Sequence, residues 1–274
     1  MNEFKGKVAV VTGAASGIGE GLARHCAKEG MRLVLADINE QRLQTLADSL
    51  DAEAVCRVTD VSDSEQVKAL ADFAWEQFGQ VDLLFNNAGV LISGASWEIP
   101  LKDWQWILNI NLMGVVHGIH HFVPRFLAQG TAAHIVNTSS LAGLMAAPLM
   151  GPYTVGKQAV LALTETLSYE LADTPVSVSA LCPGPIATGI AESGKGRDAQ
   201  AAPSEGQQQL MQFLSDGISQ GMAPADCAAL VFEAIREQRF WVFTHEDFKP
   251  EYQRRIDDLM ANRNPLYNQY TVDE

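Results

Sequence analysis

The segment Lys7-Val-Ala-Val-Val-Thr-Gly-Ala-Ala-Ser-Gly-Ile-Gly19 decides the fold of this chain. Its first half is an apolar, β-branched run that predicts a buried parallel strand over residues 7–12. Glycines spaced G-x-x-x-G-x-G follow, and residues 20–29 then carry apolar side chains at helical spacing until Gly30. A strand, a glycine turn and a helix in this order form a phosphate cradle, because free N–H groups and the positive end of the helix dipole face the anion.

An acidic residue follows the second predicted strand. Residues 31–36 form another apolar run, and Asp37 stands at its end, eighteen residues after Gly19. A carboxylate in this position can accept hydrogen bonds from an adenosine ribose, and it would repel a 2′-phosphate. We therefore predict that the cofactor is NAD rather than NADP. Asp37 can also cap the helix expected from near Asn39, and the two roles are compatible.

Strand and helix patterns alternate along the rest of the chain. A helix with the spacing of a capping box begins at Ser62-Asp-Ser-Glu65. Further strands are predicted at 54–58, 81–85, 134–137, 176–181 and 241–243. This alternation predicts an α/β fold of the Rossmann type, a doubly wound, mainly seven-stranded parallel sheet with helices on both faces, formed by residues 1–274 as a single domain. Ligands of such sheets bind at the carboxyl ends of the strands.

A tyrosine and a lysine lie four residues apart in Gly151-Pro-Tyr-Thr-Val-Gly-Lys157, and Ser140 lies thirteen residues before Tyr153. Positions i and i+4 share one face of a helix, so the phenol and the ammonium face the same space. A nearby cation favours the phenolate and lowers its pKa from about 10 toward the range of general acid–base catalysis. The three residues can therefore move a proton at a secondary alcohol or ketone, although an exposed helix face without function shows the same spacing.

Taken together, these motifs resemble the short-chain dehydrogenase/reductase family over residues 5–245. The matching segments, in chain order, are Thr12-Gly13-Ala-Ala-Ser-Gly17-Ile-Gly19, Asp60-Val61, Asn86-Asn-Ala-Gly89, Asn111, Ser140, Tyr153-Thr-Val-Gly-Lys157, Pro183-Gly184 and Thr188. The resemblance implies an NAD-dependent enzyme. It also implies a homotetramer or homodimer whose contacts use residues 101–128 and 152–173.

The resemblance further implies a role for each catalytic residue. Tyr153 would be the general base in alcohol oxidation and the general acid in ketone reduction, and Ser140 would hydrogen-bond the substrate oxygen. The adjacent Ser139 lacks the family's spacing of thirteen residues to the tyrosine. Lys157 would bind the nicotinamide ribose and lower the pKa of Tyr153. Asn111 would hold a water between Lys157 and the solvent.

The implied cofactor site extends over several strand ends. Asp60 and Val61 would contact the adenine, and residues 87–89 would line the adenosine ribose. Ile186 and Thr188 would fix the carboxamide. The predicted NAD site comprises Gly13, Ser16, Gly17, Ile18, Gly19, Asp37, Asp60, Val61, Asn87, Ala88, Gly89, Tyr153, Lys157, Pro183, Ile186 and Thr188.

The substrate is expected to bind under a lid formed by about residues 189–220. Its first part is rich in Gly, Ala and polar residues and leads into a predicted helix at 205–219, as in loops that close over a substrate. A helical extension at about 246–274 is expected to cover the pocket of its own or a neighbouring subunit. The expected apolar walls are Leu91, Ile92, Met145, Met150, Ile190, Met211 and Leu214. Apart from Lys195 and Arg197 in the lid, no cation can be placed there, so we predict an uncharged, moderately hydrophobic alcohol or ketone of alicyclic, aromatic or steroid-like type.

Bulk properties exclude several classes of function. The net charge is −14 and no basic cluster occurs, which argues against nucleic acid or an anionic membrane surface as a partner. The apolar runs are too short to span a membrane and no signal peptide is expected, so we predict a cytoplasmic protein. The four cysteines are dispersed and are expected to be reduced thiols. His117, His120 and His121 share a helix face, and we interpret them as a helix or subunit contact rather than a metal site.

Two alternatives from other classes remain open. The chain could be a catalytically idle, NAD(H)-binding regulator, although the presence of Ser140, Tyr153, Lys157 and Asn111 argues against this. It could also catalyse another reaction on the same fold, as an epimerase, dehydratase or double-bond reductase. The spacing of the serine, the tyrosine and the lysine fits carbonyl chemistry better.

Overall fold

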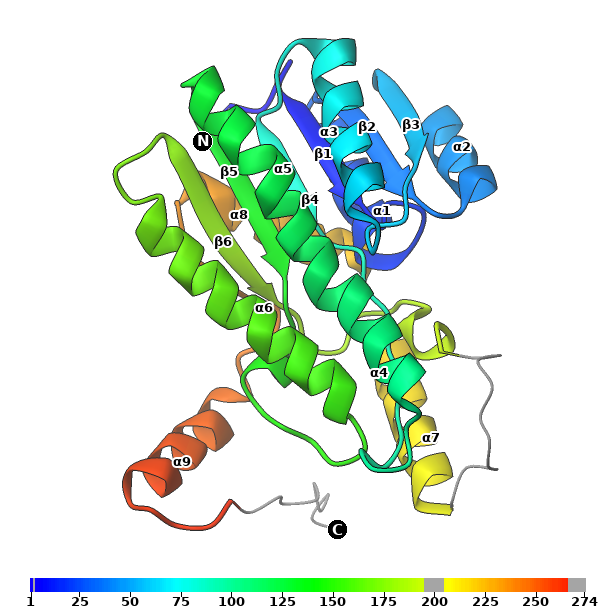
Figure 1. Ribbon diagram of the computed structural model, residues 1–274, viewed down its shortest axis with the longest axis vertical. Coiled ribbons are helices and arrows are strands. Elements are labelled where there is room, and N and C mark those ends of the chain that lie inside the picture. Colours follow the sequence, from blue (N-terminus) through cyan, green and yellow to red (C-terminus); the bar gives the residue numbers. More distant parts are fainter. Residues whose placement is uncertain (2, 195–204, 266–274) are drawn as a thin grey trace.

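The computed structural model describes residues 1, 3–194 and 205–265, and the strands among them form one parallel sheet (Figure 1). The order is β3-β2-β1-β4-β5-β6-β7. The chain moves outward from β1 to β3 and then continues from β4 on the other side of β1, so a topological switch point lies between β1 and β4. The strands are β1 (Val8–Thr12), β2 (Arg32–Asp37), β3 (Ala54–Val58), β4 (Leu83–Asn86), β5 (Ala133–Thr138), β6 (Val176–Cys182) and β7 (Trp241–Phe243). The predicted seven-stranded Rossmann-type sheet is confirmed.

Helices cover both faces of the sheet (Figure 1). Alternate residues of β1 point to opposite faces, with Ala9 and Val11 in one apolar core and Val8 and Val10 in the other. All residues of β1 are buried, which explains why the strand is apolar throughout rather than alternating. The first core is covered by α1 (Gly17–Lys28), α2 (Glu40–Ser49) and α8 (Pro224–Arg236), and the second by α3 (Ser64–Phe78), α5 (Gly114–Gln129) and α6 (Gly151–Glu170).

The beginning of α3 differs from the predicted capping box. Asp63, not Ser62, is the N-cap, and its carboxylate accepts hydrogen bonds from the N–H groups of Glu65 and Gln66. The Ser62 hydroxyl instead donates to the carboxylate of Asp60 at 2.7 Å. The Asp63 carboxylate therefore binds two of the free N–H groups of the first turn of α3.

The long helix before β5 contains a π-helical turn. Helix α4 (Leu101–Leu108) continues through the π-turn Asn109–Met113 into α5, and Asn111 is fully buried in this turn. Such turns insert one extra residue into a helix and are frequent at functional sites. The turn therefore marks Asn111 independently of its sequence motif.

Two helices lie beyond the carboxyl ends of the strands, at the bottom of Figure 1. Helix α7 (Glu205–Ser219) has the predicted bounds, and α9 (Lys249–Met260) lies within the helical extension expected at about 246–274. Phe248, just before α9, packs with Phe243 of β7 and with Tyr252, so the helix is attached to the end of the sheet. The lid residues 195–204 and the tail 266–274 lie outside the described residues.

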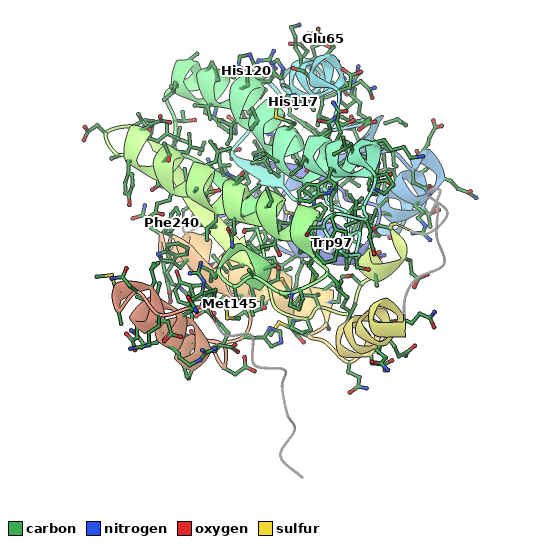
Figure 2. The ribbon with its side chains drawn as sticks, turned by 60° about the horizontal axis from the view of Figure 1, so that its bottom comes forward. Glu65, Trp97, His117, His120, Met145 and Phe240 are labelled. Atoms are coloured by element: carbon green, nitrogen blue, oxygen red, sulfur yellow. The ribbon has the colours of Figure 1, made fainter. Side chains whose placement is uncertain are left out.

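The histidines of α5 hold neighbouring segments together. A ring nitrogen of His117 lies 2.8 Å from the carbonyl oxygen of Val61, and one of His121 lies 2.9 Å from the hydroxyl of Ser64; Figure 2 shows His117 and His120 near Glu65. Among the described residues no cluster of three or more potential metal ligands occurs. Within the same residues, every helix is too short or too polar to cross a membrane.

Candidate active site

A cavity of about 1350 Å³ lies at the carboxyl edge of the sheet. Its wall includes residues at or just after the ends of six strands, namely Gly13, Asp37, Thr59, Asn87, Thr138 and Pro183. The cavity therefore spans the switch point between β1 and β4, where an open α/β sheet binds its ligand.

The glycine turn after β1 is shaped so that only glycine fits. Gly13 has a φ of +65°, and a Cβ there would lie 2.8 Å from the Cα of Ala88. A Cβ on Gly19 would lie 2.0 Å from the carbonyl oxygen of Gly13, which is a backbone clash. The turn therefore stays open toward the cavity, and α1 starts beside it, with its free N–H groups available to an anion.

Asp37 is fixed beside this turn. One carboxylate oxygen accepts a hydrogen bond from the N–H of Ala15 at 3.1 Å, and the other accepts one from the N–H of Asn39 at 3.0 Å. The N-cap of α2 is Asn39, whose side chain accepts from the N–H of Arg42, so the alternative capping role of Asp37 is wrong. Because a carboxylate can accept further hydrogen bonds, Asp37 can still bind a diol at the cavity wall.

The ends of β1 and β4 are joined by a polar network. The hydroxyl of Thr12 donates to the carbonyl of Phe85 and accepts from the N–H groups of Asn87 and Ala88. The side-chain amide of Asn87 donates to the carbonyl of Thr12 at 3.0 Å. This network fixes the carboxyl ends of β1 and β4 relative to each other, and the cofactor is expected to bind beside these ends.

The structure brings the other predicted cofactor residues to the same cavity. Its wall includes Ser16, Gly17, Ile18, Asp60, Val61, Ala88, Gly89, Pro183, Ile186 and Thr188. Gly19 is the exception, since it lies buried under the turn and allows the close approach of α1. The individual contacts of these residues with NAD stay predictions.

Ser140, Tyr153 and Lys157 lie together on the cavity wall. Tyr153 and Lys157 are one turn apart near the start of α6, with the lysine Nζ 5.7 Å from the centre of the phenol ring. The Ser140 hydroxyl accepts a hydrogen bond from the N–H of Ala142 at 3.1 Å, and it lies close enough to the phenol to lower the pKa of Tyr153. The hydroxyl of Ser139 instead donates to the backbone carbonyl of Lys157 at 2.7 Å, away from the phenol. Of the two serines, only Ser140 acts on the pKa of the tyrosine.

Burial dominates the electrostatics of this group. It raises the pKa of Tyr153, and the neighbouring Ser140 hydroxyl opposes this rise. It also lowers the pKa of Lys157 from 10.5 to about 8. The predicted lowering of the tyrosine pKa by Lys157 is therefore not seen in the protein alone. The ammonium donates to the carbonyl of Thr138 at 2.8 Å instead of to the phenol, so desolvation outweighs its attraction for a phenolate.

Asn111 lies behind the cavity wall. Its side-chain oxygen accepts from the N–H of Val90, and its amide donates to the carbonyl of the same residue, both at 2.8 Å. A Cβ on Gly89 would lie 3.4 Å from both the Asn111 oxygen and the Lys157 Nζ, so these two groups flank the same small space. The observed contacts hold the segment after β4 in place, and the water-binding role of Asn111 stays a prediction.

The apolar walls agree in part with the prediction. Leu91, Met145, Met150 and Ile190 line the cavity. Ile92 does not line it and packs instead beside the cluster that includes Tyr153. The predicted side chains Met211, Leu214, Lys195 and Arg197 lie outside the part of the structure that is described.

One charged wall of the cavity was missed by the sequence analysis. Helix α9 and the segment after it contribute Glu251, Arg254, Arg255, Asp258, Leu259, Arg263 and Pro265. The positions on the helix follow the spacing i, i+3, i+4, i+7 and i+8, which indicates one face of a helix. That spacing was visible in the sequence, but nothing local indicated that the face points toward Tyr153.

The shape and polarity of the adenosine end fit NAD. Gly13 and Gly19 leave a space that a Cβ would fill, and the N-terminus of α1 lies beside this space. The Asp37 carboxylate lies next to the turn, where it can accept hydrogen bonds from a ribose diol. The residues present are therefore those that a dinucleotide requires.

Comparison with known proteins gives a consistent set of matches. The family model for short chain dehydrogenases matches residues 7–198. The crystal structure of a short chain dehydrogenase/reductase from Burkholderia phymatum in complex with NAD superposes with a TM-score of 0.94 at 44% identity, over 98% of this chain and 99% of that one. The "CLA biosynthesis dehydrogenase/reductase" of Lactiplantibacillus plantarum is 35% identical over 97% of both chains. The 1-deoxy-11-beta-hydroxypentalenate dehydrogenase of Streptomyces exfoliatus is 34% identical over 92% of this chain and 88% of its own length.

Proposed function

The chain belongs to the short-chain dehydrogenase/reductase family of oxidoreductases, and from this premise we propose that it interconverts a secondary alcohol and a ketone with NAD(H). The observation that carries the proposal is the position of Ser140, Tyr153 and Lys157 in the same cavity as the glycine turn. A proton-transfer group and a cofactor cradle in one cavity can act on the same carbon atom. The relative that acts on a hydroxypentalenate supports a hydroxyl group as the reacting function.

The residues that would hold NAD are those of the adenosine end. The turn from Gly13 to Gly19 would bind the pyrophosphate, and Asp37 would bind the adenosine ribose. When bound, NAD supplies the acceptor for the hydride that leaves the alcohol carbon. The NAD complex of the Burkholderia phymatum protein supports the same cofactor here. The Asp37 carboxylate favours NAD over NADP because it would repel a 2′-phosphate.

Tyr153 performs the proton transfer in this proposal. In oxidation its phenolate removes the hydroxyl proton of the alcohol, and in reduction its phenol returns a proton to the carbonyl oxygen. Ser140, which lines the same cavity beside the phenol, holds the substrate oxygen at the same point. The apolar wall formed by Leu91, Met150 and Ile190 excludes water from this end of the cavity.

The buried position of Tyr153 gives the two directions opposite pH dependences. Because burial raises the pKa of Tyr153, the phenolate is scarce near neutrality. Oxidation, which needs the phenolate, is therefore expected to become faster as the pH rises. Reduction, which needs the phenol, is expected to become slower over the same range.

A panel of secondary alcohols tests the proposal. Each alcohol is incubated with the purified full chain and either NAD or NADP, and reduced cofactor is followed by its absorbance. We expect turnover with NAD for alcohols that are apolar next to the carbinol carbon, and weaker turnover with NADP. If no secondary alcohol is oxidised and no corresponding ketone is reduced, the proposed reaction is wrong.

We also propose a cytoplasmic homotetramer or homodimer. The four cysteines carry free thiols, as expected in a reducing compartment. Leu101, the first residue of α4, and Trp97, in the turn before it, are each 85% exposed, and Tyr169 near the end of α6 is 71% exposed. Large apolar side chains exposed at such positions are typical of surfaces that another subunit covers. Sedimentation equilibrium tests this, because a monomer at micromolar concentration would contradict it.

A further inference from the structure

The charged wall formed by α9 gives the cavity two chemically different ends. An uncharged substrate was predicted because, apart from Lys195 and Arg197 in the lid, no cation could be placed at the site. In the structure, the α9 wall brings three arginines, Arg254, Arg255 and Arg263, to the same cavity as Tyr153. Because α9 and the start of α6 supply separate walls, a substrate whose reacting carbon lies at Tyr153 can extend a second polar group toward these arginines.

The three arginines differ in their partners. Arg254 is ion-paired with Glu251 and with Asp258, and Arg263 is ion-paired with Asp258. Arg255 forms no hydrogen bond or ion pair with any described residue, and it is exposed on the cavity side of α9. A guanidinium without a carboxylate partner carries donors that a ligand can use.

The local charge differs from that of the whole chain. The α9 wall has three positive and two negative side chains, so it is net positive in a protein of net charge −14. Two of its cations are already neutralised by the carboxylates of Glu251 and Asp258. The field at the cavity wall is therefore centred on Arg255 and attracts an anion.

The surface between the two ends is apolar. Met145 follows the short 3₁₀ turn Leu141–Gly143 after Ser140, and it packs in the same cluster as Phe248 and Tyr252 next to α9 (Figure 2). Leu259, which is 64% exposed, lies one turn after Arg255 on the same face. The cavity can thus cover a hydrocarbon chain that leads from the catalytic end to the guanidinium.

We propose that the substrate is a hydroxy or keto carboxylate, with its carbinol carbon at Tyr153, an apolar spacer along Met145 and Leu259, and its carboxylate bound by Arg255. The proposal rests on the dehydrogenase activity proposed above and adds the substrate class and a specificity-determining residue. Arg255 takes no part in proton or hydride transfer. Its guanidinium binds ground state and transition state alike, so it acts on KM rather than on kcat.

The first test measures binding without turnover. Isothermal titration calorimetry compares decanoate with the neutral decan-1-ol on the wild-type chain, Arg255→Gln, Arg255→Lys and Lys249→Gln. The control substitution Lys249→Gln removes the same charge from the same helix. Lys249 is paired with Glu246 and is not part of the cavity wall. We expect Arg255→Gln to weaken decanoate binding about fivefold and Arg255→Lys to weaken it less, with Lys249→Gln and all decanol affinities unchanged. Equal losses in Arg255→Gln and Lys249→Gln would overturn the proposal.

The second test separates the substrate class from the reaction. Hydroxyalkanoates with the hydroxyl at successive carbons are compared with their methyl esters, using NAD and the same variants. At the best hydroxyl position we expect the acid to have a higher kcat/KM than its ester. We expect Arg255→Gln to raise the KM for the acid about fivefold, without a change in its kcat or in the kinetic constants of the ester. Equal use of acids and esters would refute the carboxylate site and leave the dehydrogenase activity intact. If neither the hydroxy acids nor their esters are oxidised while decanoate binding still depends on Arg255, the proposed dehydrogenase reaction is refuted and the carboxylate site is not.

Discussion

Lys157 carries a charge in a place where charge is costly, so its removal should stabilise the protein. The side chain is 2% exposed, and burial lowers its pKa from 10.5 to about 8. Each pKa unit corresponds to about 1.4 kcal/mol, so the buried cation costs about 3 kcal/mol at neutral pH. Lys157→Met keeps the length of the side chain and removes the charge. It also leaves the carbonyl of Thr138 without its donor, which costs about 1 kcal/mol. The variant should therefore be about 2 kcal/mol more stable than the wild type at pH 7.

The stabilisation should vanish at high pH. Between pH 8 and 10.5 the unfolded chain holds the Lys157 proton and the folded protein does not, so the free energy of unfolding of the wild type rises with pH over this range. The variant has no such group, and its advantage falls as the pH rises toward 10.5. Urea unfolding at pH 7, 8, 9 and 10 without NAD measures both effects, with Lys28→Met as the matched control on an exposed position. A variant that is less stable than the wild type at pH 7, or a difference that does not change with pH, would refute the reasoning.

The other site residues have distinct expected effects. Asp37→Asn should lower the preference for NAD over NADP in kcat/KM roughly tenfold, because it removes a charge that repels the 2′-phosphate; an unchanged ratio in paired assays would contradict this. Gly19→Ala should weaken NADH binding more than about tenfold in a fluorescence titration, since its Cβ would lie 2.0 Å from the Gly13 oxygen. Gly217→Ala, which meets open space, is the control, and equal affinities in the two variants would argue against the cradle. Ser140→Ala should lower kcat about a hundredfold with NADH affinity unchanged, and a fall in NADH affinity alone would assign the serine to the cofactor.

The fold was predictable because its signals are local. Apolar runs such as residues 8–12 and 33–36 identify buried strands wherever they occur, and the glycine turn identifies the first crossover. The residues gathered at the cavity could also be named, because parallel strands bring their carboxyl ends to one edge. This is why Ser140, Tyr153 and Lys157, separated in the sequence, could be placed together before the structure was known.

The features that were missed depend on distant contacts. The position of α9 is set by packing between Phe243, Phe248 and Met145, so its arginines could not be placed at the cavity from the sequence. The pKa of Tyr153 depends on how deeply the phenol is buried, and spacing to Lys157 carries no information about burial. The orientation of the Ile92 side chain could not be predicted either, because it is fixed by packing against the cluster that includes Tyr153.

Tyr153→Phe tests the central claim most directly, because it removes one hydroxyl group at the proposed point of proton transfer. The measurement pairs NADH affinity with the rate of NADH formation from the best secondary alcohol found in the panel. The proposed mechanism predicts that the variant binds NADH like the wild type and loses at least about a thousandfold in kcat. Near-wild-type turnover by Tyr153→Phe would contradict it.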